Sequence, residues 1–249
     1  MACTPLSIPV KTLRGEHRFQ KTSQKIFSAE GLYLKFIGHM YLDLNQYEAF
    51  IFDLDGTLID SEGYHADGFA LAVKAVSGYE ITEAERREFF EAHTSTFTPV
   101  LNERHGLKMD FAEVLEHKRA HVRKYFRTDV FPQAISFINK WRGKKRLALA
   151  SNSPKHFVRD ALVEGRMIDL FEVVCTADDV EHRKPSPEMF LLVLERLGLE
   201  PDEVLVFEDS PAGVIAAQQA GCPVIMVDNG GERSVEGVEK QTWRELKQF

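Results

Sequence analysis

Residues 49–57 read Ala-Phe-Ile-Phe-Asp53-Leu-Asp55-Gly-Thr57, a short apolar run that ends in two carboxylates placed two residues apart. Three other apolar runs also end in polar residues: 146–150 before Ser151 and Asn152, 172–176 before a loop with Lys184, and 203–207 before Glu208 and Asp209. In an open parallel sheet the carboxyl ends of the strands share one edge, where ligands bind. The sequence therefore predicts a site that brings carboxylates, a hydroxyl and an ammonium group together at this edge.

Length and composition set the class of protein. The chain has 249 residues, of which 44% are hydrophobic and 28% charged, as in globular proteins with one large or two modest domains. It has no apolar run long enough for a transmembrane helix, and its net charge of −7 argues against a broad nucleic-acid surface. Its three cysteines are far apart in the sequence, which favours a reducing compartment. We expect a cytoplasmic enzyme, a monomer or weak dimer, with no membrane or nucleic-acid partner.

The N-terminal segment differs from the remainder in charge. Residues 1–39 hold six Lys or Arg and two Glu, a net charge of +4, so the remainder carries −11. Basic, acid-poor N-termini occur in transit peptides. A start codon assigned too early, with Met40 as the true start, and a flexible tail are the alternatives. We expect residues 1–46 to be a disordered extension or the product of such a start, without a chemical role.

Periodicity predicts two kinds of segment after the first strand. The segments 65–76, 82–93, 98–103 and 111–125 carry apolar residues at helical spacing, with no strand between them. Thr82 and Glu85 form a capping-box pattern at the start of the second segment. From about residue 134, apolar strands alternate with amphipathic helices, which is typical of a parallel sheet covered on both faces. The prediction is a doubly wound α/β core of residues 47–60 and 134–249, with 61–133 inserted as a helical cap.

Each polar strand end also has a purely structural interpretation. Asp53 and Asp55 point the same way from an extended chain and can address one ligand, but Asp, Gly and Thr are also common turn residues. The segments 151–154 and 208–211 are each suited to cap a following helix. Lys184 alone is a candidate for a solvated loop cation. The functional interpretation is preferred because all four features fall at strand ends.

Phe52-Asp53-Leu-Asp55-Gly-Thr57 resembles the first motif of the haloacid dehalogenase-like hydrolase superfamily. Ser151 is similar in position to the second motif, Lys184 in His182-Arg-Lys-Pro185 to the third, and Glu208-Asp209 to the fourth. The ordered resemblance spans residues 47–228. The helical residues between the first two motifs resemble the small cap of the branch that holds β-phosphoglucomutases and sugar-phosphate phosphatases.

The resemblance implies a role for each motif residue. Asp53 would attack phosphorus to form an aspartyl phosphate, and Asp55 would act as the general acid and base, which calls for a raised pKa. Mg²⁺ would be held by Asp53, the backbone carbonyl of Asp55 and Asp209, with support from Glu208. Lys184 and Ser151 would hold the phosphoryl oxygens, with help from backbone N–H groups near Asn152.

Residues of the predicted cap carry less specific signals. His65 and Lys118 match positions that reach the site in the mutase-like branch, although either could be a plain surface residue. The stretch 88–103 departs from β-phosphoglucomutase because it contains no Lys or Arg to anchor a second phosphate. Thr94, Ser95 and Thr96 could instead bind the hydroxyls of a sugar or polyol. Hydrolysis is therefore favoured over mutase action.

The sequence as a whole predicts a Mg²⁺-dependent phosphatase that acts on a small phosphorylated metabolite, a sugar or polyol phosphate. A phosphomutase is the first alternative. The second alternative is a non-catalytic protein that binds a phosphorylated metabolite. A protein without turnover is expected to have lost Asp53, Asp55 or a metal-binding acid, and this chain retains all of them.

Overall fold

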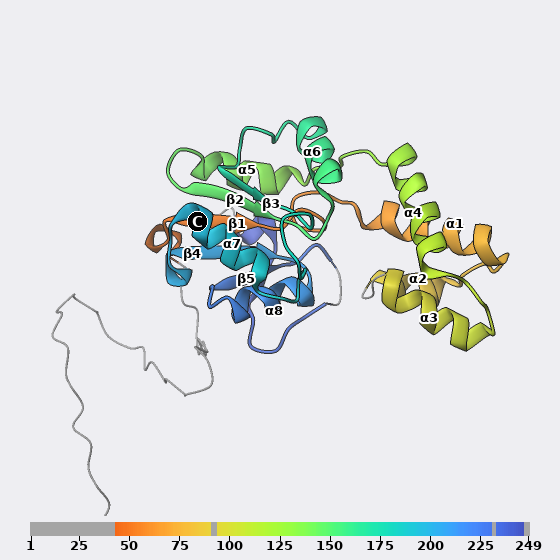
Figure 1. Ribbon diagram of the computed structural model, residues 1–249. Helices are drawn as coiled ribbons and strands as arrows, with labels where there is room; N and C mark the ends of the chain where they lie inside the picture. Colours follow the sequence, from red (N-terminus) through yellow and green to blue (C-terminus); the bar gives the residue numbers. More distant parts are fainter. Residues whose placement is uncertain (1–42, 91–93, 231–232, 247–249) are drawn as a thin grey trace, which may run out of the picture. The chain divides into compact units, whose positions relative to one another are not determined.

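The computed structural model describes residues 43–90, 94–230 and 233–246, and a sheet of parallel strands lies at its centre (Figure 1). The strand order within the described residues is β3-β2-β1-β4-β5-β6, with every neighbouring pair parallel. The strands are β1 (Ala49–Phe52), β2 (Arg146–Ala150), β3 (Val173–Cys175), β4 (Val204–Glu208), β5 (Val224–Val227) and β6 (Lys240–Gln241). This arrangement confirms the predicted α/β fold with a parallel sheet.

The central strand β1 is buried on both faces because its four residues are all apolar. Side chains alternate along a strand, so Phe50 and Phe52 enter one hydrophobic cluster while Ala49 and Ile51 enter another. Phe52 stacks on Phe207 of β4 with ring centroids 5.0 Å apart. A strand with two apolar faces can be stable only between two layers of helices.

Those two layers are present in the structure (Figure 1). The cluster on the Phe50 side is completed by α5 (Pro132–Trp141), α6 (Lys155–Glu164) and α9 (Trp243–Leu246). The opposite cluster is completed by α7 (Glu188–Leu197) and α8 (Pro211–Gln219). The 3₁₀ turns η1 (Leu44–Gln46) and η2 (Pro201–Glu203) precede β1 and β4. The core is therefore doubly wound, as the sequence predicts.

Four helices occupy the chain between β1 and α5, and they pack around a cluster of their own. They are α1 (Glu62–Ser77), α2 (Glu83–Phe90), α3 (Thr94–His105) and α4 (Phe111–Tyr125). Within this cluster Phe69 stacks on Phe89 with ring centroids 4.1 Å apart. The predicted capping box is confirmed, since Thr82 N–H donates to Glu85 at 2.8 Å and Glu85 N–H donates to the Thr82 hydroxyl at 3.2 Å.

Among the predicted helices of this region, the third differs most from the structure at its start. Helix α3 begins at Thr94 and not at residue 98, and the Thr98 hydroxyl donates to the Thr94 carbonyl at 2.7 Å within the added turn. The second predicted helix extends to residue 93, and its last three residues lie outside the described part of the chain.

The start of the packed chain also needs correction. Residues 1–42 of the predicted extension lie outside the described residues, but Leu44 is buried in the core cluster. Residues 43–46 are therefore part of the folded protein. The described residues belong to one compact unit. The division of that unit into core and cap stays a prediction, and the separate α1–α4 cluster is consistent with it.

Two C-terminal elements were missed from the sequence because they are very short. Strand β6 has two residues and α9 has four. Trp243 of α9 stacks near Phe207 and donates its indole N–H to the Thr57 carbonyl at 2.8 Å, so it braces the turn after β1. In the described part of the chain, no helix combines the length and the apolar character needed to cross a membrane.

Candidate active site

The register of the sheet brings the polar strand ends together. Phe52 is level with Leu149 of β2 and Phe207 of β4, so Asp53 follows directly beside Ala150 and Glu208. The Asp53 N–H donates to the Phe207 carbonyl at 2.9 Å, which fixes the backbone at this point. The predicted edge of the sheet therefore carries the predicted acids.

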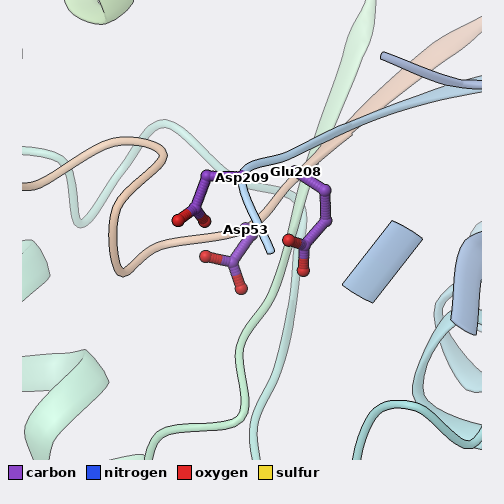
Figure 2. Close-up of side chains that lie close together, drawn as sticks. All are labelled: Asp53, Glu208 and Asp209. Carbon is purple, nitrogen blue, oxygen red and sulfur yellow. The ribbon is translucent and has the colours of Figure 1, made fainter. Parts of the chain in front are cut away.

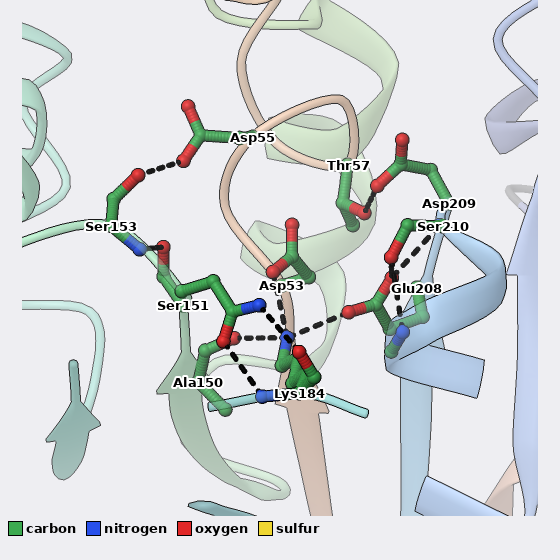
Figure 3. A network of polar contacts seen from close by, with 12 residues as sticks. Asp53, Asp55, Thr57, Ala150, Ser151, Ser153, Lys184, Glu208, Asp209 and Ser210 are labelled. Carbon is green, nitrogen blue, oxygen red and sulfur yellow. Dashed lines mark hydrogen bonds and ion pairs between the residues drawn. The ribbon is translucent and has the colours of Figure 1, made fainter. Parts of the chain in front are cut away.

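Lys184 reaches this edge from the loop after β3 and is almost fully buried. Its ammonium donates to Asp53 Oδ1 at 2.8 Å, Glu208 Oε1 at 2.6 Å and the Ala150 carbonyl at 2.7 Å (Figure 3). Burial alone would lower the pKa of Lys184, but the two carboxylates raise it above its usual value. The lysine is thus a permanent buried cation and not a solvated loop residue.

Three carboxylates at the edge could hold a metal ion. Oxygens of Asp53, Glu208 and Asp209 all lie within 4.8 Å of one another, and all three residues are buried (Figure 2). Burial raises the pKa of Asp53 well above its usual value; the Lys184 ammonium opposes this rise, whereas Glu208 and Asp209 add to it. Lys184 and Arg233 bring two positive charges to three buried acids, and hard oxygen donors are what Mg²⁺ prefers. The residues present therefore fit a divalent cation.

Two glycines allow the metal-site acids to come this close. Gly56 adopts φ +79°, and a Cβ there would lie 2.7 Å from Asp209 Cγ. Gly213 is helical in α8, and a Cβ there would overlap the Glu208 carboxylate. Asp209 also accepts from the Thr57 hydroxyl at 3.1 Å and pairs with Arg233 at 2.8 Å. Packing and hydrogen bonds therefore fix both acids.

The Asp55 side chain lies outside the cluster of three acids. Its carboxylate accepts a hydrogen bond from the Ser153 hydroxyl at 2.6 Å (Figure 3). It also accepts one from the Ser61 hydroxyl at 2.5 Å, and His65 Nε2 lies 3.7 Å away. Burial alone would raise the pKa of Asp55, but the contacts with His65, Ser153 and Ser61 lower it below the usual value. The expectation of a raised pKa at Asp55 is therefore wrong for this structure. The cause is that its side chain turns toward His65 and two hydroxyl donors.

Ser151 and Asn152 have contacts that the sequence did not reveal. Ser151 is fully buried and does not line the pocket; its hydroxyl accepts the Ser153 N–H at 3.0 Å. Asn152 lines the pocket, and its amide accepts the Lys184 N–H at 3.0 Å and donates to the Lys184 carbonyl at 3.2 Å. Neither side chain caps α6, whose first N–H donates to Asp178. Asn152 thus holds the Lys184 backbone, and a role of Ser151 in phosphate binding stays a prediction.

The four predicted residues from the helices α1, α3 and α4 line the same pocket as the acids. His65, Thr94, Ser95 and Lys118 belong to a pocket of about 830 Å³ that also contains Asp53 and its neighbours. The Lys118 ammonium donates to the Thr94 hydroxyl at 3.3 Å and lies 5.0 Å from the Phe89 ring centroid. Burial lowers the pKa of Lys118 to about 8, although Asp55 opposes this shift. Every predicted site residue except Ser151 and Thr96 thus lines this pocket.

Several pocket residues were not predicted. They are Ser61, Ser153, Phe89, Phe111, Leu115, Arg119, Arg183 and Arg233, with residues of the turn before α8. Helical spacing from Lys118 could have identified Leu115 and Phe111, because residues three, four and seven apart share one helix face. Arg183 could have been identified because it directly precedes Lys184 in the sequence. No sequence signal points to Arg233, which follows the last long strand.

The site combines acids, a buried ammonium and a pocket at the carboxyl edge of a parallel sheet. This combination is typical of α/β enzymes with a polar site at the strand ends. A profile of the family described as haloacid dehalogenase-like hydrolase matches residues 47–221. The match covers more than half of the chain, and the chain belongs to this family. The resemblance inferred from the four motifs is confirmed.

Individual relatives agree with this membership. The chain is 36% identical over 189 residues to the phosphorylated carbohydrates phosphatase of Thermotoga maritima, covering 70% of this chain and 82% of the relative. It is 27% identical over 186 residues to the fructose-1-phosphate phosphatase YqaB of Escherichia coli, covering 73% and 97%. The crystal structure of CbbY from Rhodobacter sphaeroides in complex with xylulose-(1,5)bisphosphate shares the fold, with a TM-score of 0.69, 22% identity and coverage of 80% and 96%.

Proposed function

We propose that this chain is a Mg²⁺-dependent phosphatase that hydrolyses a small phosphorylated metabolite, a sugar or polyol phosphate. The observation that carries the proposal is the buried group of Asp53, Glu208, Asp209 and Lys184 at the base of the pocket. The names of the relatives support it, because two of them are phosphatases of phosphorylated carbohydrates. The family supports the hydrolytic chemistry.

Asp53 is the proposed nucleophile. One carboxylate oxygen bonds to phosphorus, and the bond from phosphorus to the ester oxygen breaks, which leaves an aspartyl phosphate and an alkoxide. Lys184 donates to Asp53 Oδ1 at 2.8 Å and thereby orients the attacking group. The same ammonium stands beside the phosphoryl oxygens and offsets the negative charge that develops on them.

Asp55 is the proposed proton carrier. It gives its proton to the leaving alkoxide and later removes a proton from the water that attacks the aspartyl phosphate, so the two steps restore its starting state. Ser61 and Ser153 hold it in the carboxylate form that the second step requires. Arrival of a phosphate dianion raises the pKa of a neighbouring acid, which supplies the protonated form for the first step.

Asp53, Asp209 and the backbone carbonyl of Asp55 would hold Mg²⁺, and Glu208 would support it from the adjacent strand end. When bound, the ion supplies positive charge that draws electron density from the phosphoryl oxygens. The cluster of Asp53, Glu208 and Asp209 oxygens within 4.8 Å of one another supports this proposal for the side-chain ligands. A monomer or weak dimer and a cytoplasmic location remain our expectations.

The chain offers no arginine or lysine in residues 88–103 with which a mutase could anchor a second phosphate. Thr94 and Ser95 line the pocket in this region and present hydroxyl groups. This lining suits the hydroxyls of a carbohydrate, and the phosphatase names of the relatives favour hydrolysis over transfer within the substrate.

The test is phosphate release from a panel of sugar, polyol and nucleotide monophosphates, with Mg²⁺ or with EDTA. We expect release from carbohydrate phosphates that is lost with EDTA and in Asp53→Asn. Asp169→Asn is the matched control, because this exposed acid lies outside the pocket and is expected to retain wild-type turnover. Conversion of glucose 1-phosphate to its 6-phosphate without release would instead establish a mutase. Silence in both assays would contradict an enzymatic role.

A further inference from the structure

Helix α4 presents a mixed apolar and cationic stripe to the pocket. Phe111, Leu115, Lys118 and Arg119 all line it. Leu115 follows Phe111 by four residues, and Lys118 and Arg119 follow Leu115 by three and four, which places them on one side of the helix. The apolar pair comes first and the two cations follow one turn later. The stripe therefore ends in a compact positive group, which we call the α4 cation pair (Lys118 and Arg119).

Within the described residues, neither member of the α4 cation pair forms an ion pair with a carboxylate, although Asp55 is near enough to act on Lys118 electrostatically. Among the described residues, Lys118 has only the Thr94 hydroxyl at 3.3 Å and the Phe89 ring as polar or cation–π contacts. The exposed Arg119 guanidinium has no ion pair or hydrogen bond within the same part of the chain. Two adjacent positive charges, one of them partly buried, repel each other, and a bound anion relieves this repulsion. The proximity of Arg119 is one reason that the pKa of Lys118 is low.

The charges that line the pocket lead to the same conclusion. Four carboxylates and five cationic side chains line it, the cations being Lys118, Arg119, Arg183, Lys184 and Arg233. Lys184 and Arg233 pair with the metal-site acids, whereas Arg183 is exposed and has no described ion pair. A divalent cation would add to this positive excess. A phosphate monoester dianion alone leaves the pocket with excess positive charge.

We propose that the α4 cation pair is a second anion subsite, and that the substrate carries a carboxylate or a second phosphate besides the phosphoryl group that is removed. This inference rests on the proposed function and narrows its substrate class from neutral carbohydrate phosphates to sugar-acid phosphates or bisphosphates. Arg119 is then a specificity-determining residue. Its planar fork can bind either anion through two parallel hydrogen bonds.

The experiment compares matched pairs of esters that differ only in the second anion. Phosphoglycolate is compared with ethylene glycol phosphate for the carboxylate arm, and glucose 1,6-bisphosphate with glucose 1-phosphate for the phosphate arm. We expect the second anion to raise kcat/KM by roughly ten- to a hundredfold, as one charge-assisted hydrogen-bonding group does, mainly through KM. A preference on one arm alone supports the subsite and identifies its anion.

Arg119→Gln removes the charge and the guanidinium fork while keeping a polar side chain, and it is expected to bring the ratio within each pair close to one. Arg123→Gln is the matched control, because Arg123 is exposed one turn further on α4, pairs with Glu116 and does not line the pocket. It should keep the wild-type ratio, and thermal unfolding checks that both variants are folded. Hydrolysis of all esters with a ratio near one in the wild type, or a ratio that survives Arg119→Gln, overturns the subsite alone. No phosphate from any ester overturns the proposed function.

Discussion

Gly213 is predicted to be essential for the position of Glu208, although it carries no functional group. A Cβ at residue 213 would lie 2.5 Å from Glu208 Oε2 and closer still to the other carboxylate atoms. Ordinary contact between such atoms begins at about 3.5 Å, so the carboxylate must retreat by at least about 1 Å. Glu208 is fully buried and held by several hydrogen bonds, so the retreat must disturb these bonds.

The displacement would break contacts on which the site depends. Glu208 accepts from Lys184 at 2.6 Å and from the Ser210 N–H and hydroxyl, both at 2.9 Å. Misplacement of a supporting group by about 1 Å can cost roughly a hundredfold in rate. We therefore expect Gly213→Ala to lower kcat/KM about a hundredfold and to raise the Mg²⁺ concentration for half-maximal activity about tenfold or more.

The free energy of unfolding should fall by no more than about 2 kcal/mol. Overpacking costs about 1–3 kcal/mol, and the better helix propensity of alanine offsets about 1 kcal/mol of it. Gly63→Ala is the matched control, because Gly63 is also helical, in the first turn of α1, and a Cβ there meets nothing within 4 Å. Phosphate-release kinetics across a Mg²⁺ titration make the measurement. Wild-type kcat/KM and wild-type Mg²⁺ dependence in Gly213→Ala would refute the argument.

Two further predictions concern the α1–α4 helices. Hydrogen bonds from Thr82 and His105 outweigh burial and lower the pKa of Glu85 to about 2, against 4.5 for the unfolded chain. The ionised form of Glu85 therefore stabilises the fold fully above about pH 5, and this stabilisation is lost as the pH falls toward 2. Glu85→Gln should lower the free energy of unfolding by on the order of 3 kcal/mol at neutral pH. In thermal unfolding, the difference between variant and wild type should shrink as the pH falls from 5 to 2. A difference that is constant with pH would exclude the charge of Glu85 as its cause. Burial lowers the pKa of Lys118 to about 8, so kcat/KM should fall as the pH rises through about 8. Lys118→Arg should move that decline to higher pH, because arginine stays protonated. An unchanged pH profile in the variant would show that another group titrates.

The sheet and its polar edge could be predicted because the signals are local. Four apolar runs of strand length, each followed by polar residues, specify both the strands and the edge at which they meet. Asp53 and Lys184 are far apart in the sequence, yet the register of β1 leaves them hydrogen-bonded. Helical spacing and a capping box likewise sufficed for α2 and α4.

Side-chain direction could not be predicted in the same way. Asp55 was expected to have a raised pKa, but its side chain turns toward His65, Ser61 and Ser153. Ser151 was expected at the site, whereas the hydroxyl that lines the pocket belongs to Ser153, two residues further on. Arg119 lines the pocket because of how α4 packs, which depends on contacts between helices and not on a motif. Such facts depend on tertiary packing, which a single sequence does not encode locally.

The central claim is that Asp53 is the carboxylate that attacks phosphorus, and chemical trapping tests it most directly. During turnover of the best substrate with Mg²⁺, rapid quenching followed by borohydride reduces an aspartyl phosphate to homoserine, which peptide mass spectrometry locates. The account predicts homoserine at residue 53, dependent on substrate and absent at residue 55. Homoserine at another acid, or continued phosphate release with no trapped residue, would contradict it.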